Sequence, residues 1–445
     1  MKNTDLTTCS ISRGLFLFSL PLLGSSLIQQ LYNTVDLIFV GNFVGKEASA
    51  AVGATSLLTV CIIGFFNGLG VGVGVIVSQF FGAKQPGDVR RTVQTAAGIT
   101  IAGSILVTIL GWFLSPLFLS WMQIPESIMG MALTYIRIYF LSIFSIVSYN
   151  ISSGVLRSVG DSRSPMIYQL IGGVANIFGD AFFICLLDLG VAGAALATML
   201  SQTLAACMAI HHLCRLPEEY RFHLREIRME LPVARRIFFI GIPEAFRSML
   251  ITFANLIVQT QINTLRVDSM AAYASYCKAE GFLYLPQWAV GQANTVFVGQ
   301  NLGAKKLDRV TKSTRTAIFM AVAITLCISA LILLFPTQVF RLFSSDQEIV
   351  ALSAKIGTTT FGLYFIYGIV EVLSGAIRGA GKTMPPMVIS VANMCGVRLI
   401  VLHILMLFFH TVNEIAIVFP ITWITTALSV IIYYRSGRWK PQGIE

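Results

Sequence analysis

The stretch ASAAVGATSLLTVCIIGFFNGLGVGVGVIVSQFFGAK, residues 48–84, contains no charged side chain before Lys84. A helix needs about 20 mostly apolar residues to cross the hydrocarbon core of a bilayer, and residues 48–78 exceed that length. Five glycines occur from Gly64 to Gly74. Because small residues let helix backbones approach closely, we favour tight helix packing over a hinge at these glycines. The stretch predicts a membrane-spanning helix.

Eleven further apolar stretches of similar length occur along the 445 residues. The chain is 55% hydrophobic and only 12% charged, whereas soluble domains carry roughly 25% charged residues. So little charge excludes a soluble enzyme or a nucleic-acid-binding module. Helices satisfy their own backbone polar groups inside lipid, so we predict an all-α polytopic membrane protein with twelve transmembrane helices. The predicted spans are residues 14–40, 48–78, 92–114, 128–150, 165–187, 190–213, 237–261, 270–300, 314–335, 352–376, 385–409 and 413–434.

An internal repeat relates the two halves of the chain. Gly82-Ala83-Lys84 recurs as Gly303-Ala304-Lys305, 221 residues later, and the same offset relates several residues of 153–166 to 374–387. Each half contains six spans, an even number, so both halves enter the membrane in the same sense. We therefore predict two pseudo-symmetric six-helix bundles that are parallel repeats.

Lysine and arginine are distributed unevenly between the two sides of the predicted membrane. Of 31 such residues, 23 fall on the side of the N-terminus and four on the other side. Because cytoplasmic loops carry the excess of basic residues, we place both termini in the cytoplasm and the multi-pass chain in the cell membrane. The sizeable polar segment 215–236 predicts a cytoplasmic linker between an N-lobe, residues 1–214, and a C-lobe, residues 237–445. Arg157 and Arg378, in two inner loops, are interpreted as anchors at the lipid interface.

Acidic residues inside the predicted spans are few, and an ionisable group within a membrane is by default a functional candidate. Asp36 lies near the outer end of the first span, and Asp180 lies towards the outer end of the fifth. Asn176 precedes Asp180 by one helical turn and shares its face, and Thr198 lies at the same depth in the sixth span. Two carboxyl groups, an amide and a hydroxyl predict a site for Na⁺ or a proton. Snorkelling of Asp36 to the interface and a structural hydrogen bond of Asp180 are the alternatives.

These blocks resemble the multidrug and toxic compound extrusion (MATE) family of transporters, of prokaryotic type, over essentially the whole chain. The resemblance is carried by Pro21 and Asp36, Gly82-Ala83-Lys84, Leu156-Arg157 to Pro165, Asn176-x3-Asp180 and the second-half copies of the loop blocks. It implies a V-shaped pair of six-helix lobes that exports cationic amphipathic compounds in exchange for H⁺ or Na⁺. In similar prokaryotic members an Asp of span 1, an Asn and an Asp of span 5 and a Thr of span 6 form a cation site. The matching residues here are Asp36, Asn176, Asp180 and Thr198.

The second half departs from the family pattern. Some relatives carry acidic cation ligands in spans 7 and 10, and the place in span 10 here holds Tyr367, with Glu371 one turn further along. Glu280 in span 8 is interpreted either as a substrate or coupling group or as the partner of a basic residue such as Arg398. The candidates for substrate binding or coupling in this half are Glu280, Glu371, Arg398 and Tyr367.

The function that these features predict is antiport by alternating access, in which a cation binds one state of the transporter better than the other. We expect the lipid bilayer and small cationic or amphipathic organic compounds as partners, no nucleic acid, and no cofactor besides H⁺ or Na⁺ as the coupling ion. We expect a functional monomer. A flippase of a lipid-linked precursor, with a related architecture, is the alternative cargo. A membrane enzyme is the alternative class, and we do not expect it because the five histidines form no HExxH motif.

Overall fold

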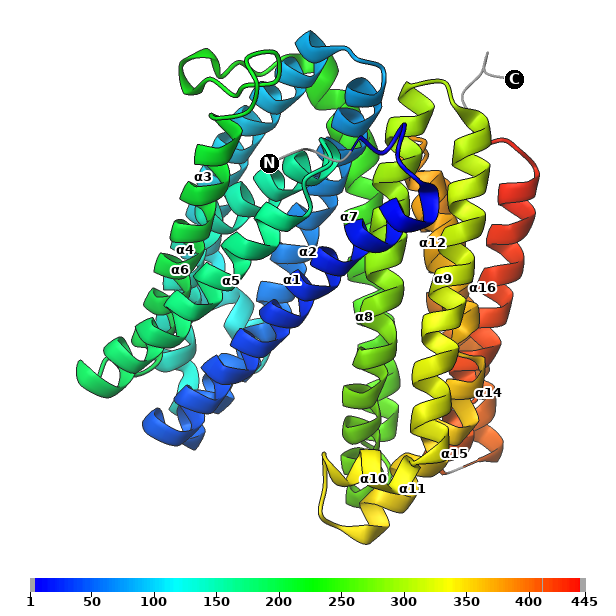
Figure 1. Cartoon of the computed structure of the whole chain (residues 1–445). Helices are drawn as coiled ribbons and strands as arrows, with labels where there is room; N and C mark the ends of the chain where they lie inside the picture. Colours follow the sequence, from blue (N-terminus) through cyan, green and yellow to red (C-terminus); the bar gives the residue numbers. More distant parts are fainter. Residues whose placement is uncertain (1–4, 410, 441–445) are drawn as a thin grey trace. The chain divides into compact units, whose positions relative to one another are not determined.

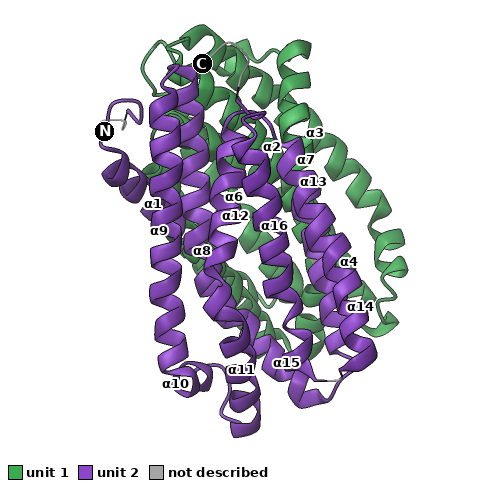
Figure 2. Cartoon of the chain, turned by 90° about the vertical axis from the view of Figure 1, so that its right-hand side faces the viewer, with its two compact units in different colours: residues 1–4, 24–245 green, residues 5–23, 246–445 purple. Residues whose placement is uncertain are grey.

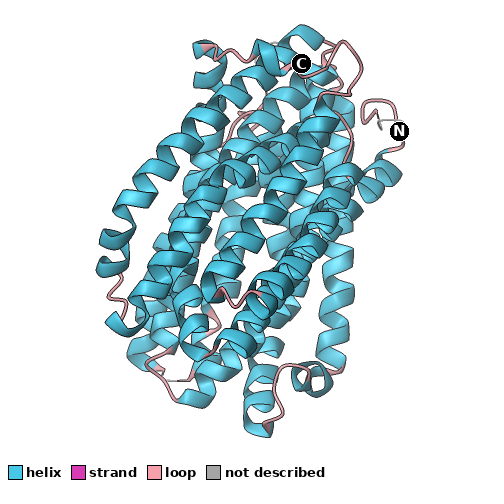
Figure 3. Ribbon diagram, turned by 90° about the vertical axis from the view of Figure 1, so that its left-hand side faces the viewer, coloured by secondary structure: helices cyan, strands magenta, loops and turns pink. Residues whose placement is uncertain are grey.

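The computed structural model describes residues 5–409 and 411–440, and within these ranges the chain consists of helices and loops, without strands (Figures 1 and 3). The α-helices are α1 (Ile11–Phe39), α2 (Lys46–Gly82), α3 (Pro86–Trp121), α4 (Glu126–Ser158), α5 (Arg163–Asp180), α6 (Gly190–Leu213), α7 (Leu231–Ile262), α8 (Val267–Gly303), α9 (Leu307–Leu334), α10 (Pro336–Arg341), α11 (Gln347–Thr360), α12 (Phe365–Gly379), α13 (Met384–Val391), α14 (Arg398–Phe408), α15 (Val412–Ile415) and α16 (Val418–Arg435). Short π-helical segments η1 (Val40–Val44), η2 (Ala181–Leu186) and η5 (Ala392–Val397), and 3₁₀ turns η3 (Leu224–Glu226) and η4 (Phe361–Leu363), complete the helical structure.

The helices confirm the predicted polytopic all-α fold. In the described part of the chain ten helical segments are long and apolar enough to cross a membrane, and α11 and α12, bent by 49° at their junction, together form an eleventh. Helix α8 is 37 residues long and coincides with the predicted span 270–300, although Lys278 and Glu280 make it more polar. The twelve predicted spans therefore each correspond to a helix or a pair of helices.

The chain packs into two compact units (Figure 2). Unit 1 contains residues 24–245 and unit 2 contains residues 5–23 together with the residues from 246 onwards. Two helices are therefore divided between the units. The first half of α1 belongs to unit 2 and its second half to unit 1, whereas the first half of α7 belongs to unit 1 and its second half to unit 2. The division into lobes 1–214 and 237–445 follows the order of the spans and stays a prediction.

In unit 1 the first half of α7 packs against α2 through glycines. A Cβ atom built at Gly68 would lie 2.5 Å from the backbone nitrogen of Ala245, and one at Gly72 would lie 2.7 Å from the carbonyl oxygen of Ile237. Ile237 and Ile240 are buried in the same apolar core as α2. Gly68 and Gly72 thus serve close helix packing, the interpretation favoured from the sequence.

In unit 2 the first half of α1 takes the corresponding place against α8. Leu15, Phe18 and Leu22 share one buried cluster with Ala289 and Ala293. These two alanines follow Gly68 and Gly72 by the repeat offset of 221. Small residues therefore occupy the same positions of both repeats, and the two units use the same mode of packing.

Side-chain contacts also hold the segment that precedes α7 and the segment that precedes α1. Arg90 of α3 forms an ion pair with Glu226 of the loop before α7. In unit 2, Lys306 Nζ donates to the carbonyl oxygen of Thr7 at 2.9 Å, and Arg309 donates to the carbonyl oxygens of Leu6 and Cys9. Basic side chains at the start of the third helix of each repeat, α3 and α9, therefore hold the segment that precedes α7 in unit 1 and α1 in unit 2.

Candidate functional site

Three helices of unit 1 bring together the carboxyl groups that the sequence singles out. Asp36 of α1 and Asp180 of α5 are 8% and 0% exposed, and their carboxyl groups are close enough to interact. Asn176, one turn before Asp180, is fully buried. Gly179 lets α6 approach closely, since a Cβ atom there would lie 3.0 Å from that of Ala197. Thr198 follows Ala197 and is 9% exposed.

Several polar atoms of this cluster have no hydrogen-bond partner among the described residues. Asp36 Oδ1, both oxygens of Asp180 and both polar atoms of the Asn176 amide are buried without a hydrogen bond. No basic side chain of the described residues forms an ion pair with either carboxylate. A buried carboxylate without a partner is costly, so the arrangement requires a proton or a cation. Interface snorkelling does not describe Asp36, because its side chain is buried.

Tyrosines surround the two carboxyl groups. Tyr32, one turn before Asp36, is 8% exposed and accepts a hydrogen bond at 3.2 Å from Gln202 Nε2 of α6. Tyr135 of α4 is buried and interacts electrostatically with both aspartates. Hydroxyl groups can donate to a carboxylate or offer an oxygen to a cation. Sequence reasoning did not identify Tyr32 or Tyr135, although the spacing of Tyr32 and Asp36 by four residues on one helix face would have indicated the first.

The donors in unit 1 suit a hard monovalent cation or a proton. Among the described residues no group of three or more His, Cys, Asp or Glu side chains could hold a metal ion. The cluster instead offers two carboxylates with amide and hydroxyl oxygens. Hard cations prefer oxygen ligands of this kind, and a shared proton would also relieve repulsion between neighbouring carboxylates.

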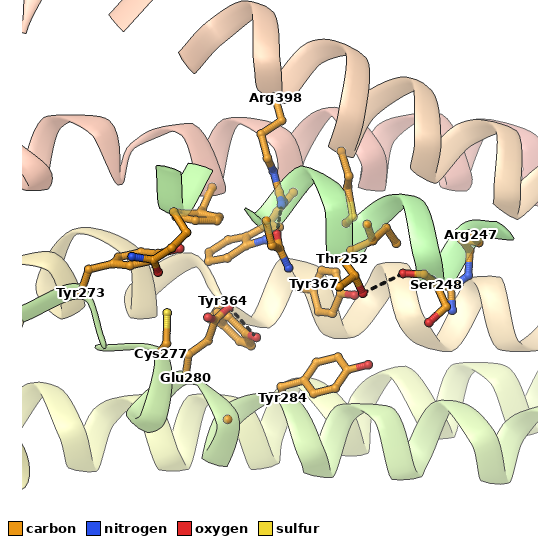
Figure 4. A pocket seen from close by; sticks show the side chains of 17 residues that line it. Arg247, Ser248, Thr252, Tyr273, Cys277, Glu280, Tyr284, Tyr364, Tyr367 and Arg398 are labelled. Atoms are coloured by element: carbon orange, nitrogen blue, oxygen red, sulfur yellow. Dashed lines mark hydrogen bonds between the residues drawn. The ribbon is translucent and has the colours of Figure 1, made fainter. Parts of the chain in front are cut away.

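Unit 2 encloses a cavity of about 430 Å³ between α7, α8, α12, α14 and α16. Figure 4 shows its lining side chains. The walls contain aromatic side chains, two arginines, one glutamate and several uncharged polar groups: Arg247, Ser248, Ile251, Thr252, Asn255, Gln259, Tyr273, Cys277, Glu280, Gly281, Tyr284, Tyr364, Tyr367, Met394, Arg398, Phe419 and Trp423. A concave space of this size with a few polar groups is typical of a small-molecule site.

Three of the four candidates in the second half line this cavity: Glu280, Arg398 and Tyr367. Tyr364 Oη donates to Glu280 Oε1 at 3.2 Å. Arg398 donates to Asn255 Oδ1 at 2.6 Å and to Thr422 Oγ1 at 3.3 Å. The described residues show no direct ion pair between Glu280 and Arg398, the pairing considered from the sequence. Glu280 instead accepts a hydrogen bond from Tyr364, and Arg398 donates to Asn255 and Thr422.

Glu371 does not line the cavity. Its Oε1 accepts a hydrogen bond from Arg378 Nη2 at 2.7 Å, and both side chains are almost inaccessible to solvent. The interpretation of Arg378 as an anchor at the lipid interface was wrong, because this side chain is 0% exposed. Its spacing of seven residues from Glu371, two turns of one helix, is the signal that would have revealed the pair.

Breaks in helical geometry position the cavity residues. The bend between α11 and α12 lies at Tyr364, and the carbonyl oxygen of Tyr364 accepts a hydrogen bond from Gln287 Nε2 at 3.4 Å. The π-helical segment η5 ends directly before Arg398, and η2 begins directly after Asp180. Such wide turns are frequent at functional sites, and hydropathy alone does not reveal them. The aromatic wall formed by Tyr273, Phe419 and Trp423 was also not predicted.

Comparison with known proteins identifies the family. The chain is 26% identical to the "Probable multidrug resistance protein YoeA" of Bacillus subtilis over 98% of this chain and 96% of that protein. It is 25% identical to the "Multidrug export protein MepA" of Staphylococcus aureus over 84% and 82%. An outward-facing multidrug resistance MATE family transporter of the MOP superfamily has the same fold, with a TM-score of 0.91 and 22% identity over 99% of this chain and 100% of that one. The MatE family model matches twice, at residues 21–182 and 243–404. The two matches begin 222 residues apart and cover most of the chain, which therefore belongs to the MatE family of membrane transporters and is not an enzyme.

Proposed function

We propose that this protein is a secondary antiporter that exports amphipathic organic cations from the cell in exchange for H⁺ or Na⁺. The names of its relatives support multidrug export and favour drugs over a lipid-linked precursor as cargo. The excess of basic residues on one side supports cytoplasmic termini and a location in the cell membrane. The protein acts as a monomer and needs no cofactor besides the coupling ion.

The observation that carries the proposal is the unpartnered carboxyl pair of unit 1. Asp36 and Asp180 are buried, close together and without a basic partner among the described residues. Their charge is tolerable only when a proton or Na⁺ is bound. With Asn176 and Thr198 they form the proposed coupling site. A site of this kind responds to an ion gradient, because occupancy changes the net charge that the protein must bury.

Coupling follows if the cation and the exported compound favour different states. A ligand shifts a conformational equilibrium only through its different affinities for the two states. The loaded carboxyl pair favours the state that faces the cytoplasm after the compound has left. Compound binding favours the outward-facing state, from which the compound is released. Downhill cation entry then drives uphill export by alternating access.

The decisive experiment measures dye efflux in proteoliposomes under a sodium gradient and a pH gradient imposed separately. We expect one gradient to drive efflux by the wild-type protein and Asp180→Asn to abolish that response, since the amide cannot exchange a proton and is a weaker cation ligand. Asp188→Asn is the matched control, because Asp188 is an exposed loop residue with a positive φ that Asn tolerates. Wild-type efflux by the Asp180→Asn protein would contradict the assignment of the coupling site.

A further inference from the structure

The cavity of unit 2 carries opposite charges on facing walls. In Figure 4, Arg398 points into the cavity from α14, on the side opposite α8, which carries Glu280. The two charges interact electrostatically but form no direct ion pair in the part of the chain that the structure describes. A small molecule can therefore lie between them.

Arg398 is held as a fixed cationic group. Arg398 is 3% exposed, and its guanidinium donates to Asn255 and Thr422 and lies 5.1 Å from the ring centroid of Phe419. Its Nε has no hydrogen-bond partner among the described residues. A buried guanidinium bonded only to neutral groups keeps its full charge, and a carboxylate is the planar anion that best fits its donors.

Glu280 provides the opposite charge on the other wall. One carboxylate oxygen accepts the hydrogen bond from Tyr364, and this tyrosine also packs edge-on against Trp423 with ring centroids 4.8 Å apart. Tyrosine and tryptophan faces near a carboxylate favour a cationic or aromatic group. The side of the cavity at Glu280 is thus suited to a delocalised organic cation.

A ligand with a single charge fits this cavity poorly. A simple cation at Glu280 leaves the Arg398 guanidinium without an anionic partner. A simple anion at Arg398 leaves Glu280 uncompensated. Because a buried charge without a countercharge is costly, both walls are satisfied together only by a molecule that carries both charges.

We propose that the unit 2 cavity binds amphipathic aromatic zwitterions, with the ligand carboxylate at Arg398 and the cationic end at Glu280. The aromatic body of the ligand lies against Tyr284 and Tyr367, which line the cavity and are partly exposed. This inference rests on the proposed export of amphipathic compounds and narrows their class, since it requires an anionic group in addition to the cation. The volume of about 430 Å³ lies within the range of drug-sized sites.

The test compares two dyes that differ only in the anion. Tetramethylrhodamine carries a xanthylium cation and a free carboxylate, and its methyl ester keeps the cation alone. Fluorescence anisotropy with the purified full-length protein gives the dissociation constant of each dye. We expect the free acid to bind about tenfold more tightly or better, as a charge-assisted pair with arginine implies.

Variants of Arg398 and Glu280 test which wall of the cavity binds each end of the ligand. Arg398→Gln should remove the preference for the free acid and leave binding of the methyl ester unchanged, which also shows that the protein is folded. Arg398→Lys keeps the charge and should retain part of the preference. Glu280→Gln should weaken both dyes by a similar factor. Lys278→Gln is the control, because Lys278 is exposed on the same helix and does not line the cavity.

Equal affinity for the two dyes, tighter binding of the ester, or a preference that survives Arg398→Gln would each overturn the inference. Binding of neither dye would overturn it as well. Measuring gradient-driven transport of both dyes in proteoliposomes distinguishes failure of this inference from failure of the proposed export function. If a cation gradient moves both dyes equally, the export function holds and the zwitterion preference fails, whereas absence of gradient-driven movement of either dye contradicts the export function itself.

Discussion

At the scale of single residues, the ion pair of Glu371 and Arg378 shows how unit 2 accommodates charge away from its cavity. Both groups are almost fully buried, at 1% and 0% exposure, and their charges neutralise one another across 2.7 Å. The Cγ of Glu371 also lies 2.8 Å from a Cβ built at Gly291, so α8 and α12 are in close contact here. A pair in this setting stabilises the packing of α12 against α8.

Removing one charge of this pair should destabilise the protein strongly. We expect Glu371→Gln to lower the free energy of unfolding by roughly 3 to 5 kcal/mol, because the arginine loses its buried countercharge. The double variant Glu371→Leu with Arg378→Met should recover most of that loss. Thermal unfolding of purified protein, followed by intrinsic fluorescence, measures both. A double variant that is less stable than Glu371→Gln would show that the charges act independently.

The sequence predicted the buried polar cluster of unit 1 better than the cavity of unit 2. Asp36, Asn176 and Asp180 could be placed at one depth because charge within a span is rare and helical periodicity relates positions 176 and 180. Arg378 could not be placed by its type alone, since a basic residue near a span end suits either an interface or a buried pair. The aromatic wall depends on contacts between Tyr273, Phe419 and Trp423, which come from helices distant in sequence, and periodicity identifies such residues only as buried.

At the scale of helices, the contact between α2 and α7 depends on residues without side chains. We expect Gly72→Ala to lower stability by about 1 to 3 kcal/mol, the usual cost of overpacking, since its Cβ would lie 2.7 Å from the Ile237 carbonyl oxygen and 3.0 Å from the Gly241 nitrogen. Gly87→Ala, at a glycine with nothing within 4 Å of its Cβ, is the control. Comparison of apparent melting temperatures in one detergent tests the difference, and equal values would refute close packing at Gly72.

The loop before α7 should loosen on acidification. The hydrogen bond from Arg90 holds the pKa of Glu226 below its ordinary value of 4.5, assisted by Gln94 and opposed by slight desolvation. A lowered carboxyl pKa means that the contact stabilises the loop fully above pH 4.5 and is lost as the pH falls through the lower folded value. Hydrogen exchange of residues 222–230, corrected for intrinsic rates, should therefore show protection that falls progressively as the pH is lowered from 4.5 to 3.

Variants of this loop separate the ion pair from general acid effects. Glu226→Gln should show the low protection already at pH 7 and little further change on acidification. Glu219→Gln, at an exposed position of the same loop, should behave like the wild-type protein. If protection of the wild-type loop does not change between pH 7 and pH 3, the Arg90 contact does not hold the loop.

Helix boundaries were largely predictable, because length and hydropathy determine where a chain can cross a bilayer. The predicted span 190–213 coincides with α6, and 413–434 lies within one residue of the combined bounds of α15 and α16. The π-helical segments and the bend at Tyr364 were not predictable. They arise from local hydrogen-bond choices that a run of apolar residues leaves open, such as the bond from Gln287 to the Tyr364 carbonyl oxygen.

At the scale of the whole molecule, the repeat and the packing divide the chain differently. The repeat begins again after about 221 residues, as the paired family matches at 21–182 and 243–404 also show. Packing places residues 5–23 in unit 2 and extends unit 1 to residue 245. The first helix of each repeat thus contributes its leading half to the core formed by the other repeat. Sequence similarity detects the repeat but not this exchange, since buried apolar residues suit either core.

The exchange predicts which fragments of the chain are stable. We expect the fragment 24–245 to be monodisperse in detergent, because it contains all segments of unit 1, including Ala234, Ile237 and Ile240 in its core. The fragment 1–214 lacks these residues, and its Leu15 and Phe18 lack the α8 surface against which they pack, so it should aggregate. The fragment 24–214 lacks both residues 5–23 and the first half of α7. It therefore separates the effect of the exposed first half of α1 from the effect of the missing α7 residues. Size-exclusion chromatography of the three fragments tests the prediction, and equal behaviour of 1–214 and 24–245 would show that the lobes divide at the central loop instead.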